Sequence, residues 1–238
     1  MAASLRLVFN PTGDLEAAAR DCEADVFLQW YGNTRAQLVD EYGPYERDSV
    51  FLAVVDEHDD VMACGRLLTG ATGQLKTIVD VQSPPWAVDA PRAAAAVGID
   101  LTSTWDLATM GVQPGIGQGA HRLAFTLYHG FTTAIRVNQV GAMIAILDGR
   151  VHQLVASAGV HLQALPGTTP ARYLGSASST PVYARAATYF DYQRRNAPEA
   201  HRVASPTCDR DAGSRASAAD HCRTHGPTDV NGIGGAMW

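Results

Sequence analysis

The sequence has little lysine, little cysteine and no long apolar run. Lys76 is the only lysine among 238 residues, beside 17 arginines, and it lies in Gln74-Leu75-Lys76-Thr77. That context lacks the Gly-Lys-Ser/Thr element of a P-loop, and a Schiff-base enzyme would have to use Lys76 itself. No stretch reaches the ~18 uninterrupted apolar residues that a membrane helix needs. P-loop and membrane-spanning proteins are therefore not expected.

Positive charge is also scarce. Eighteen basic residues stand against 24 acidic ones, so the net charge is −6 and no basic tract exists, which argues against nucleic-acid binding. The N-terminal segment lacks the basic start and long apolar stretch of a signal peptide. Four cysteines are too few and too scattered for a disulfide framework: Cys22, Cys64, Cys208 and Cys222. We therefore expect a reduced, soluble, cytoplasmic protein.

The composition changes near residue 196. Residues 1–196 contain regularly spaced apolar runs and predict one folded domain, whereas residues 197–238 have almost no aliphatic clusters and predict a disordered tail. The tail raises the alternative of a zinc site, but its candidate ligands fit no compact spacing: Cys208, His221, Cys222 and His225. We expect no metal.

Apolar periodicity predicts a β-α-α-β-β-β-α-β-α-β-β order in the folded part. The expected strands are 5–9, 50–55, 61–69, 105–112, 140–147, 161–165 and 181–189, the expected helices are 14–30, 35–41, 120–136 and 151–158, and 70–101 is expected to be irregular. The hairpins exclude a purely parallel sheet. An α/β fold with a mixed, mostly antiparallel central sheet flanked by helices follows.

The main chemical signal is a glycine-rich turn between an expected strand and an expected helix, Val112-Gln113-Pro114-Gly115-Ile116-Gly117-Gln118-Gly119-Ala120-His121. Unpaired N–H groups and the helix dipole favour an anion at such a place, and glycines let a pyrophosphate approach. The glycine spacing differs from the Rossmann fingerprint. A plain tight turn is the alternative.

This segment resembles the coenzyme-binding motif of the GNAT acyltransferase superfamily, with its V-x-P opening and its glutamine- and glycine-containing loop. Ala120 stands where the motif has a further glycine. The resemblance implies a GNAT-like fold and acyl-coenzyme A or acetyl-coenzyme A as co-substrate. It implies the following binding residues: Val112, Gly115, Gly117, Gln118, Gly119, Ala120 and His121.

Two other segments resemble one branch of that superfamily, the acyl-homoserine lactone synthases. Residues 64–69, CGRLLT, are similar to their "cARLLpT" segment, and residues 105–110, WDLATM, are similar to their "WELSRF" segment. Glu41-Tyr42 lies near the place of their acidic element, and residues 151–167 resemble their closing helix-Gly-strand region. The resemblance covers about residues 20 to 190.

The chain departs from these synthases at the residues that handle S-adenosylmethionine. Asp106 and Thr109 replace a glutamate and an arginine, and the acidic pair is reduced to Glu41 plus Tyr45 or Glu46. We therefore rank acyl-homoserine lactone synthesis lowest among the possible activities.

The resemblance offers three candidate catalytic residues. Asp106 would be the base that takes the ammonium proton, or else a carboxylate that orients Arg66. Arg66 would form an ion pair with Asp106 or bind a substrate carboxylate. Tyr128 would stand near the leaving thiolate, or be a plain aromatic residue of its helix.

We expect an N-acyltransferase that moves an acyl group from acyl-coenzyme A, or from an acyl carrier protein, to an amino acid or small amine by direct attack. The pantetheine arm should lie between strands 105–112 and 140–147. The alternative is a catalytically silent GNAT-fold module that binds an acyl thioester or a protein partner.

Overall fold

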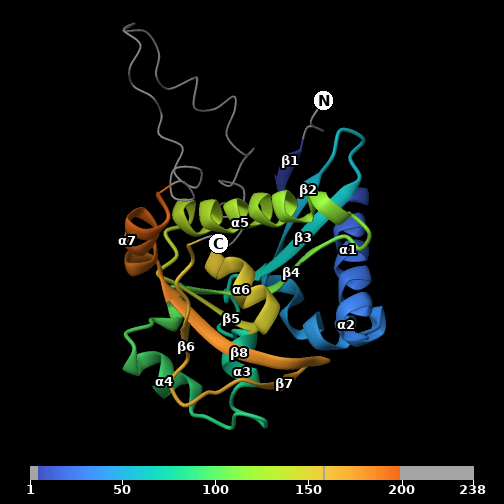
Figure 1. Cartoon of the computed structure of the whole chain (residues 1–238). Coiled ribbons are helices and arrows are strands. Elements are labelled where there is room, and N and C mark those ends of the chain that lie inside the picture. The colour runs from blue at the N-terminus through green and yellow to red at the C-terminus, as the bar shows by residue number, and fades with distance from the viewer. Residues whose placement is uncertain (1–4, 158, 199–238) are drawn as a thin grey trace, which may run out of the picture.

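The computed structural model describes residues 5–157 and 159–198, in which eight strands form one sheet in the order β1-β2-β3-β4-β5-β8-β6, with β7 paired to β8 (Figure 1). The elements are β1 (Arg6–Phe9), α1 (Asp14–Tyr31), α2 (Arg35–Tyr42), β2 (Ser49–Val55), β3 (Val61–Leu68), α3 (Lys76–Asp80), α4 (Ala90–Ala96), β4 (Thr104–Val112), α5 (Ala120–Val137), β5 (Ala142–Asp148), α6 (Gly149–Ser157), β6 (Gln163–Ala164), β7 (Ala171–Tyr173), β8 (Ser176–Arg185) and α7 (Ala186–Asn196). Short 3-10 turns precede β2, β4 and α5.

The sheet is mixed and mostly antiparallel, as expected. Within the described residues only β4 and β5 pair in parallel. The expected disordered tail, 197–238, lies outside the described residues apart from its first two.

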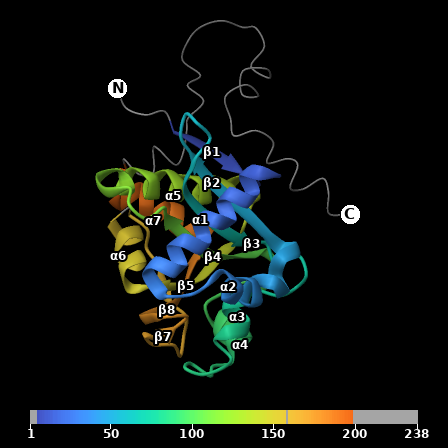
Figure 2. The ribbon, with the colours of Figure 1, turned by 90° about the vertical axis from the view of Figure 1, so that its right-hand side faces the viewer.

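Strand β2 is buried on both faces, which explains its continuous apolar run. Val50, Leu52 and Val54 pack toward α5, and the alternate residues Phe51 and Ala53 pack toward α1. Helices α1 and α5 therefore cover opposite faces of the sheet (Figure 2).

The other helices also pack on one or the other of these two faces of the sheet. Helix α3 touches the face of β4 that α1 covers, because Thr77 binds Asp106 on that strand. Helices α6 and α7 pack with the α5 side through a cluster that includes Val155 and Tyr189.

The structure corrects the expectation for two segments. Residues 70–101 contain α3 and α4, and Asp89 caps α4 by accepting a hydrogen bond from the N–H of Arg92. The expected strand 181–189 ends at Arg185, where the chain turns into α7. The Ala-Ala-Thr start of α7 has no apolar pattern that separates it from a strand end.

Strand β4 carries a bulge. Arg66 on β3 pairs with Thr109, but the next residue, Leu67, pairs with Leu107, so Ala108 is an extra residue. The bulge turns Leu107 and Met110 both toward α5, although strict alternation would place them on opposite faces. The hydroxyl of Tyr42 donates to the carbonyl of Ala108 at 3.4 Å.

Candidate acyl-thioester site

Strands β4 and β5 separate soon after they begin to pair. Their parallel pairing is restricted to Thr104–Asp106 against Ala142–Ile144, although β4 continues to Val112 and β5 to Asp148. Beyond Asp106 the described part of the chain pairs β4 with β3 alone. The sheet therefore opens into a gap at the place where the pantetheine arm was expected.

Three cavities follow one another through this gap and along α5. The outer one, about 330 Å³ and partly open to solvent, is lined by both Ala120 and Leu127. A small connecting space is lined by Tyr128, and an inner cavity of about 60 Å³ reaches Ile135. Met110, beside the bulge of β4, lines all three.

The inner cavity is almost purely apolar. Its walls come from β4, β5, α5, α6, β8 and α7 and include Leu107, Phe131, Met143, Ala145, Leu147, Val155, Val160, Leu162 and Val182. Burial of apolar surface there gives about 25 cal/mol per Å², or roughly 0.8 kcal/mol per buried CH₂ group. Such a cavity suits a hydrocarbon chain.

The glycine-rich turn borders the outer cavity. Gly115 and Gly117 have φ values of 88° and 64°, which the turn requires and which glycine adopts without strain. No side chain caps the start of the following short turn or of α5, and the N–H of Ala120 donates to the carbonyl of Gly117.

The seven expected binding residues divide into three groups. Val112, Gly115 and Ala120 line the outer cavity, and Gly117 and Gly119 form the short helical turn before α5. His121 is exposed with its ring edge-on to Phe125, and the side chain of Gln118 lies outside the described residues.

Asp106 faces away from this gap. Its carboxylate is 1% exposed and accepts hydrogen bonds from the backbone N–H of Thr77 at 2.6 Å and from the Thr77 hydroxyl at 2.9 Å. Burial raises the pKa of Asp106 to about 7, against the opposing effects of the Thr77 bonds and of Lys76. It therefore holds the N-terminus of α3.

Arg66 binds Glu23, not Asp106. Its Nε and Nη2 donate to the two carboxylate oxygens at 3.0 and 2.5 Å, and both side chains are about 97% buried. The guanidinium lies over the rings of Tyr42 and Phe51, 4.6 and 4.5 Å from their centres. The expected ion pair of Arg66 with Asp106 is therefore wrong. Arg66 pairs with Glu23 of α1, whereas Asp106 accepts hydrogen bonds from Thr77 of α3.

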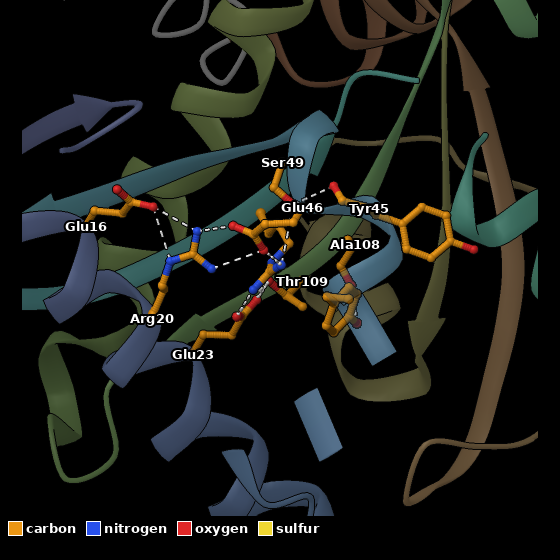
Figure 3. Close-up of polar contacts among 10 residues, drawn as sticks. Glu16, Arg20, Glu23, Tyr45, Glu46, Ser49, Ala108 and Thr109 are labelled. Atoms are coloured by element: carbon orange, nitrogen blue, oxygen red, sulfur yellow. Dashed lines mark hydrogen bonds and ion pairs between the residues drawn. The ribbon is translucent and has the colours of Figure 1, made fainter. Parts of the chain in front are cut away.

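A polar cavity of about 370 Å³ lies beside this pair, between α1 and α2. Figure 3 shows Arg20 between Glu16 and Glu46, with Glu23 of the same helix nearby. The hydrogen bond from Arg20 lowers the pKa of Glu46, which is half-exposed. Glu23 also accepts a hydrogen bond from the hydroxyl of Thr109 at 2.6 Å, which connects this cavity to the bulge of β4.

One charged cluster was missed from the sequence. Lys76 is 4% exposed and forms ion pairs with Glu41 of α2 and Asp80 of its own helix, and it donates to the hydroxyl of Tyr173 at 2.8 Å. The i,i+4 spacing of Lys76 and Asp80 was the available signal. The contacts with Glu41 and Tyr173 depend on the tertiary fold.

None of the helices described by the structure is both long and apolar enough to cross a membrane. In residues 5–157 and 159–198, no three histidine, cysteine, aspartate or glutamate side chains stand together so that they could hold a metal ion. The tail residues considered for zinc lie outside this range.

Solved structures share this architecture. The N-acyl amino acid synthase FeeM from uncultured soil microbes superposes with a TM-score of 0.58 at 8% identity, over 81% of this chain and 95% of that one. The CoA-dependent acyl-homoserine lactone synthase BjaI gives 0.54 at 18% identity, over 90% and 96%. The chain has the acyl-homoserine lactone synthase fold.

The synthase LasI also matches, with a TM-score of 0.51 at 10% identity, over 77% of this chain and 90% of that one. No protein-family model and no curated protein match the sequence. The resemblance of the sequence to this branch of the GNAT superfamily is thus confirmed at the level of the fold.

Proposed function

We infer that this protein is an N-acyltransferase that takes an acyl group from acyl-coenzyme A and transfers it to the amine of a small molecule. The single observation that carries the proposal is the passage, by which we mean the three cavities that succeed one another along α5, from beside the glycine-rich turn to the apolar inner cavity. Its order matches the parts of an acyl thioester: phosphate, pantetheine, sulfur and hydrocarbon chain. The folds of FeeM and BjaI support the same reaction class.

The two ends of the passage suit the two ends of the donor. N–H groups at the start of α5 would bind phosphate oxygens, and Arg150 lines the outer cavity with its guanidinium over the ring of Trp30. The inner cavity would hold the acyl chain. Acetyl-coenzyme A would leave that cavity empty, so longer acyl donors should bind more tightly.

The acceptor would enter from the polar cavity between α1 and α2. Thr109, which contacts Glu23 beside that cavity, directly precedes Met110, which lines the donor passage. The two sides of the strand therefore bring a charged cavity and an apolar one together at the bulge. An amino acid or small amine fits the mixed charges of Arg20, Glu23 and Glu46.

In the reaction, the amine nitrogen attacks the thioester carbonyl carbon, the C–N bond forms and the C–S bond breaks. Asp106 remains our candidate for the base, since a pKa of about 7 suits proton transfer at neutral pH. It is enclosed beneath Thr77, so this role requires α3 to move or a water molecule to enter. The proposed place of this reaction is the cytoplasm, where the free thiols of Cys22 and Cys64 would stay reduced.

Binding and thiol release test the proposal directly. Acyl-coenzyme A donors of increasing chain length, and an acyl carrier protein loaded with the same chains, should raise the melting temperature of the protein. Thiol release should then depend on one member of a panel of amino acids and amines. Failure of every donor to shift the melting temperature would remove the basis of the proposal.

Two matched variants locate the donor. Ala124→Trp fills the passage, because Ala124 lines the outer and connecting spaces, and it should abolish the shift with acyl-coenzyme A. Ala17→Trp places the same side chain on the exposed surface of α1 and should leave the shift unchanged.

A second candidate function is binding of an acyl thioester without turnover. The enclosure of Asp106 beneath α3 favours it, since the candidate base has no open path to an amine. Donor binding without thiol release for any acceptor, unchanged in Asp106→Ala, would identify this silent module.

A further inference from the structure

Helices α5 and α7 meet through an unusual polar contact inside an apolar region. On α7, Tyr189 and Gln193 are four residues apart, and on α5, Tyr128 and Thr132 have the same spacing, so each pair lies on one helix face. The amide nitrogen of Gln193 donates to the hydroxyl oxygen of Tyr128 at 2.9 Å, and the hydroxyls of Thr132 and Tyr189 are 3.4 Å apart.

Gln193 is fully buried, with 0% of its surface exposed. Its carboxamide oxygen has no hydrogen-bond partner among the described residues. A buried amide with one unpaired polar atom is less favourable than an apolar side chain of similar shape. A role other than stability would explain why this position carries glutamine.

Tyr128 stands where the acyl chain would join the pantetheine arm. It lies eight residues into α5 from Ala120, which is about 12 Å along the helix axis at 1.5 Å per residue. It lines the connecting space and the inner cavity, between the outer cavity for the arm and the apolar cavity for the chain. On the proposed function, the thioester sulfur falls beside Tyr128.

We propose that Gln193 is a positioning residue, which donates to Tyr128 Oη and so leaves the hydroxyl proton of Tyr128 free to bond the departing sulfur. Because the amide nitrogen donates to Tyr128 Oη, the O–H of Tyr128 has to point to another acceptor, and Tyr128 lines the connecting space. Burial raises the pKa of Tyr128, against hydrogen bonds from Thr132 and Gln193, so the phenol keeps its proton during the reaction.

The step is balanced without further reagents. The amine forms the C–N bond, the C–S bond breaks, and the electron pair moves to sulfur, which accepts a hydrogen bond from Tyr128 as its charge develops. The thiolate takes its proton from solvent, and the proton released by the nitrogen returns to solvent through the base. Tyr128 is unchanged at the end.

The test compares Gln193→Met with Tyr128→Phe and their double variant, using the donor and acceptor that give the fastest thiol release with the natural chain. Gln193→Met should lower kcat about tenfold, leave KM for the donor within about twofold and leave the melting temperature unchanged or raised. The double variant should be no slower than Tyr128→Phe. Gln153→Met, on the exposed surface of α6, is the control.

Gln193→Glu gives an independent readout. At a pH high enough to ionise the buried glutamate, its carboxylate cannot donate to Tyr128 and would instead accept a hydrogen bond from the phenol, so kcat at that pH should fall at least as far as in Tyr128→Phe, although the phenol is retained. A parallel loss of kcat and melting temperature in Gln193→Met, full additivity in the double variant, or full activity of Gln193→Glu would overturn the proposal. Absence of thiol release by the natural chain would instead overturn the proposed function itself, and this inference with it.

Discussion

The buried pair of Arg66 and Glu23 allows a sharp test of whether Arg66 is structural. In Arg66→Met, the Glu23 carboxylate would stay buried without its cation and keep only the hydrogen bond from Thr109. Removing one partner of a buried ion pair costs about 3–5 kcal/mol. The packing of the guanidinium between Tyr42 and Phe51 is lost as well, which puts the expectation in the upper part of that range.

The assay is equilibrium unfolding in urea, with a thermal scan beside it. For a domain of this size, 1 kcal/mol corresponds to about 2–4 °C, so the melting temperature should fall by roughly 6–20 °C. Arg150→Met is the matched control. Arg150 also pairs with a carboxylate, Asp148, and lies over aromatic rings, but its side chain is 58% exposed, so its loss should cost about 0–1 kcal/mol.

A double variant separates pairing from packing. Arg66→Met together with Glu23→Met removes both charges, and it should be more stable than the sum of the single losses predicts. Strict additivity, or a loss below about 1 kcal/mol in Arg66→Met, would refute the structural assignment. A stable Arg66→Met protein with a raised KM for an acidic acceptor would show that Arg66 binds the substrate carboxylate.

Three further changes test other parts of the structure. Burial raises the pKa of Asp106 to about 7 in the folded state, so its contribution to the free energy of unfolding is full at low pH and is lost between about pH 4 and pH 7. In Asp106→Asn, the free energy of unfolding in urea should therefore fall less between these two pH values. The same fall as in the natural chain would contradict the prediction. Lys76→Met leaves Glu41 and Asp80 without their shared cation and should cost about 3–5 kcal/mol at pH 7 in the same assay, whereas an unchanged midpoint would show that the ion pairs add nothing. Ala145→Phe fills the inner cavity and should weaken long-chain acyl-coenzyme A in thermal-shift titrations while acetyl-coenzyme A binds as before; an equal loss for both donors would count against an acyl-chain cavity.

The sequence allowed most of the helices and strands and the glycine-rich turn to be predicted, because these are local patterns. The bulge of β4 could not be predicted, since WDLATM has neither a glycine nor a proline that would mark it. The partners of Arg66 and Asp106, and the contacts of Lys76 with Glu41 and Tyr173, could not be predicted either. Glu23 lies 43 residues from Arg66, and Thr77 lies 29 residues from Asp106, so the fold alone brings them together.

The bulge also explains how one strand borders two cavities of opposite character, which on the proposed function would take the two substrates. Strict alternation would turn Thr109 and Leu107 to the same face and Met110 to the other, which would mix a polar side chain into the apolar passage. The extra residue Ala108 instead places Leu107 and Met110 in the passage and leaves Thr109 with Glu23 on the charged side. On the proposed function the acyl carbon and the amine have to meet, so the bulge of β4 would be their meeting point, because Met110 lines the apolar cavities and Thr109 contacts Glu23 of the charged one.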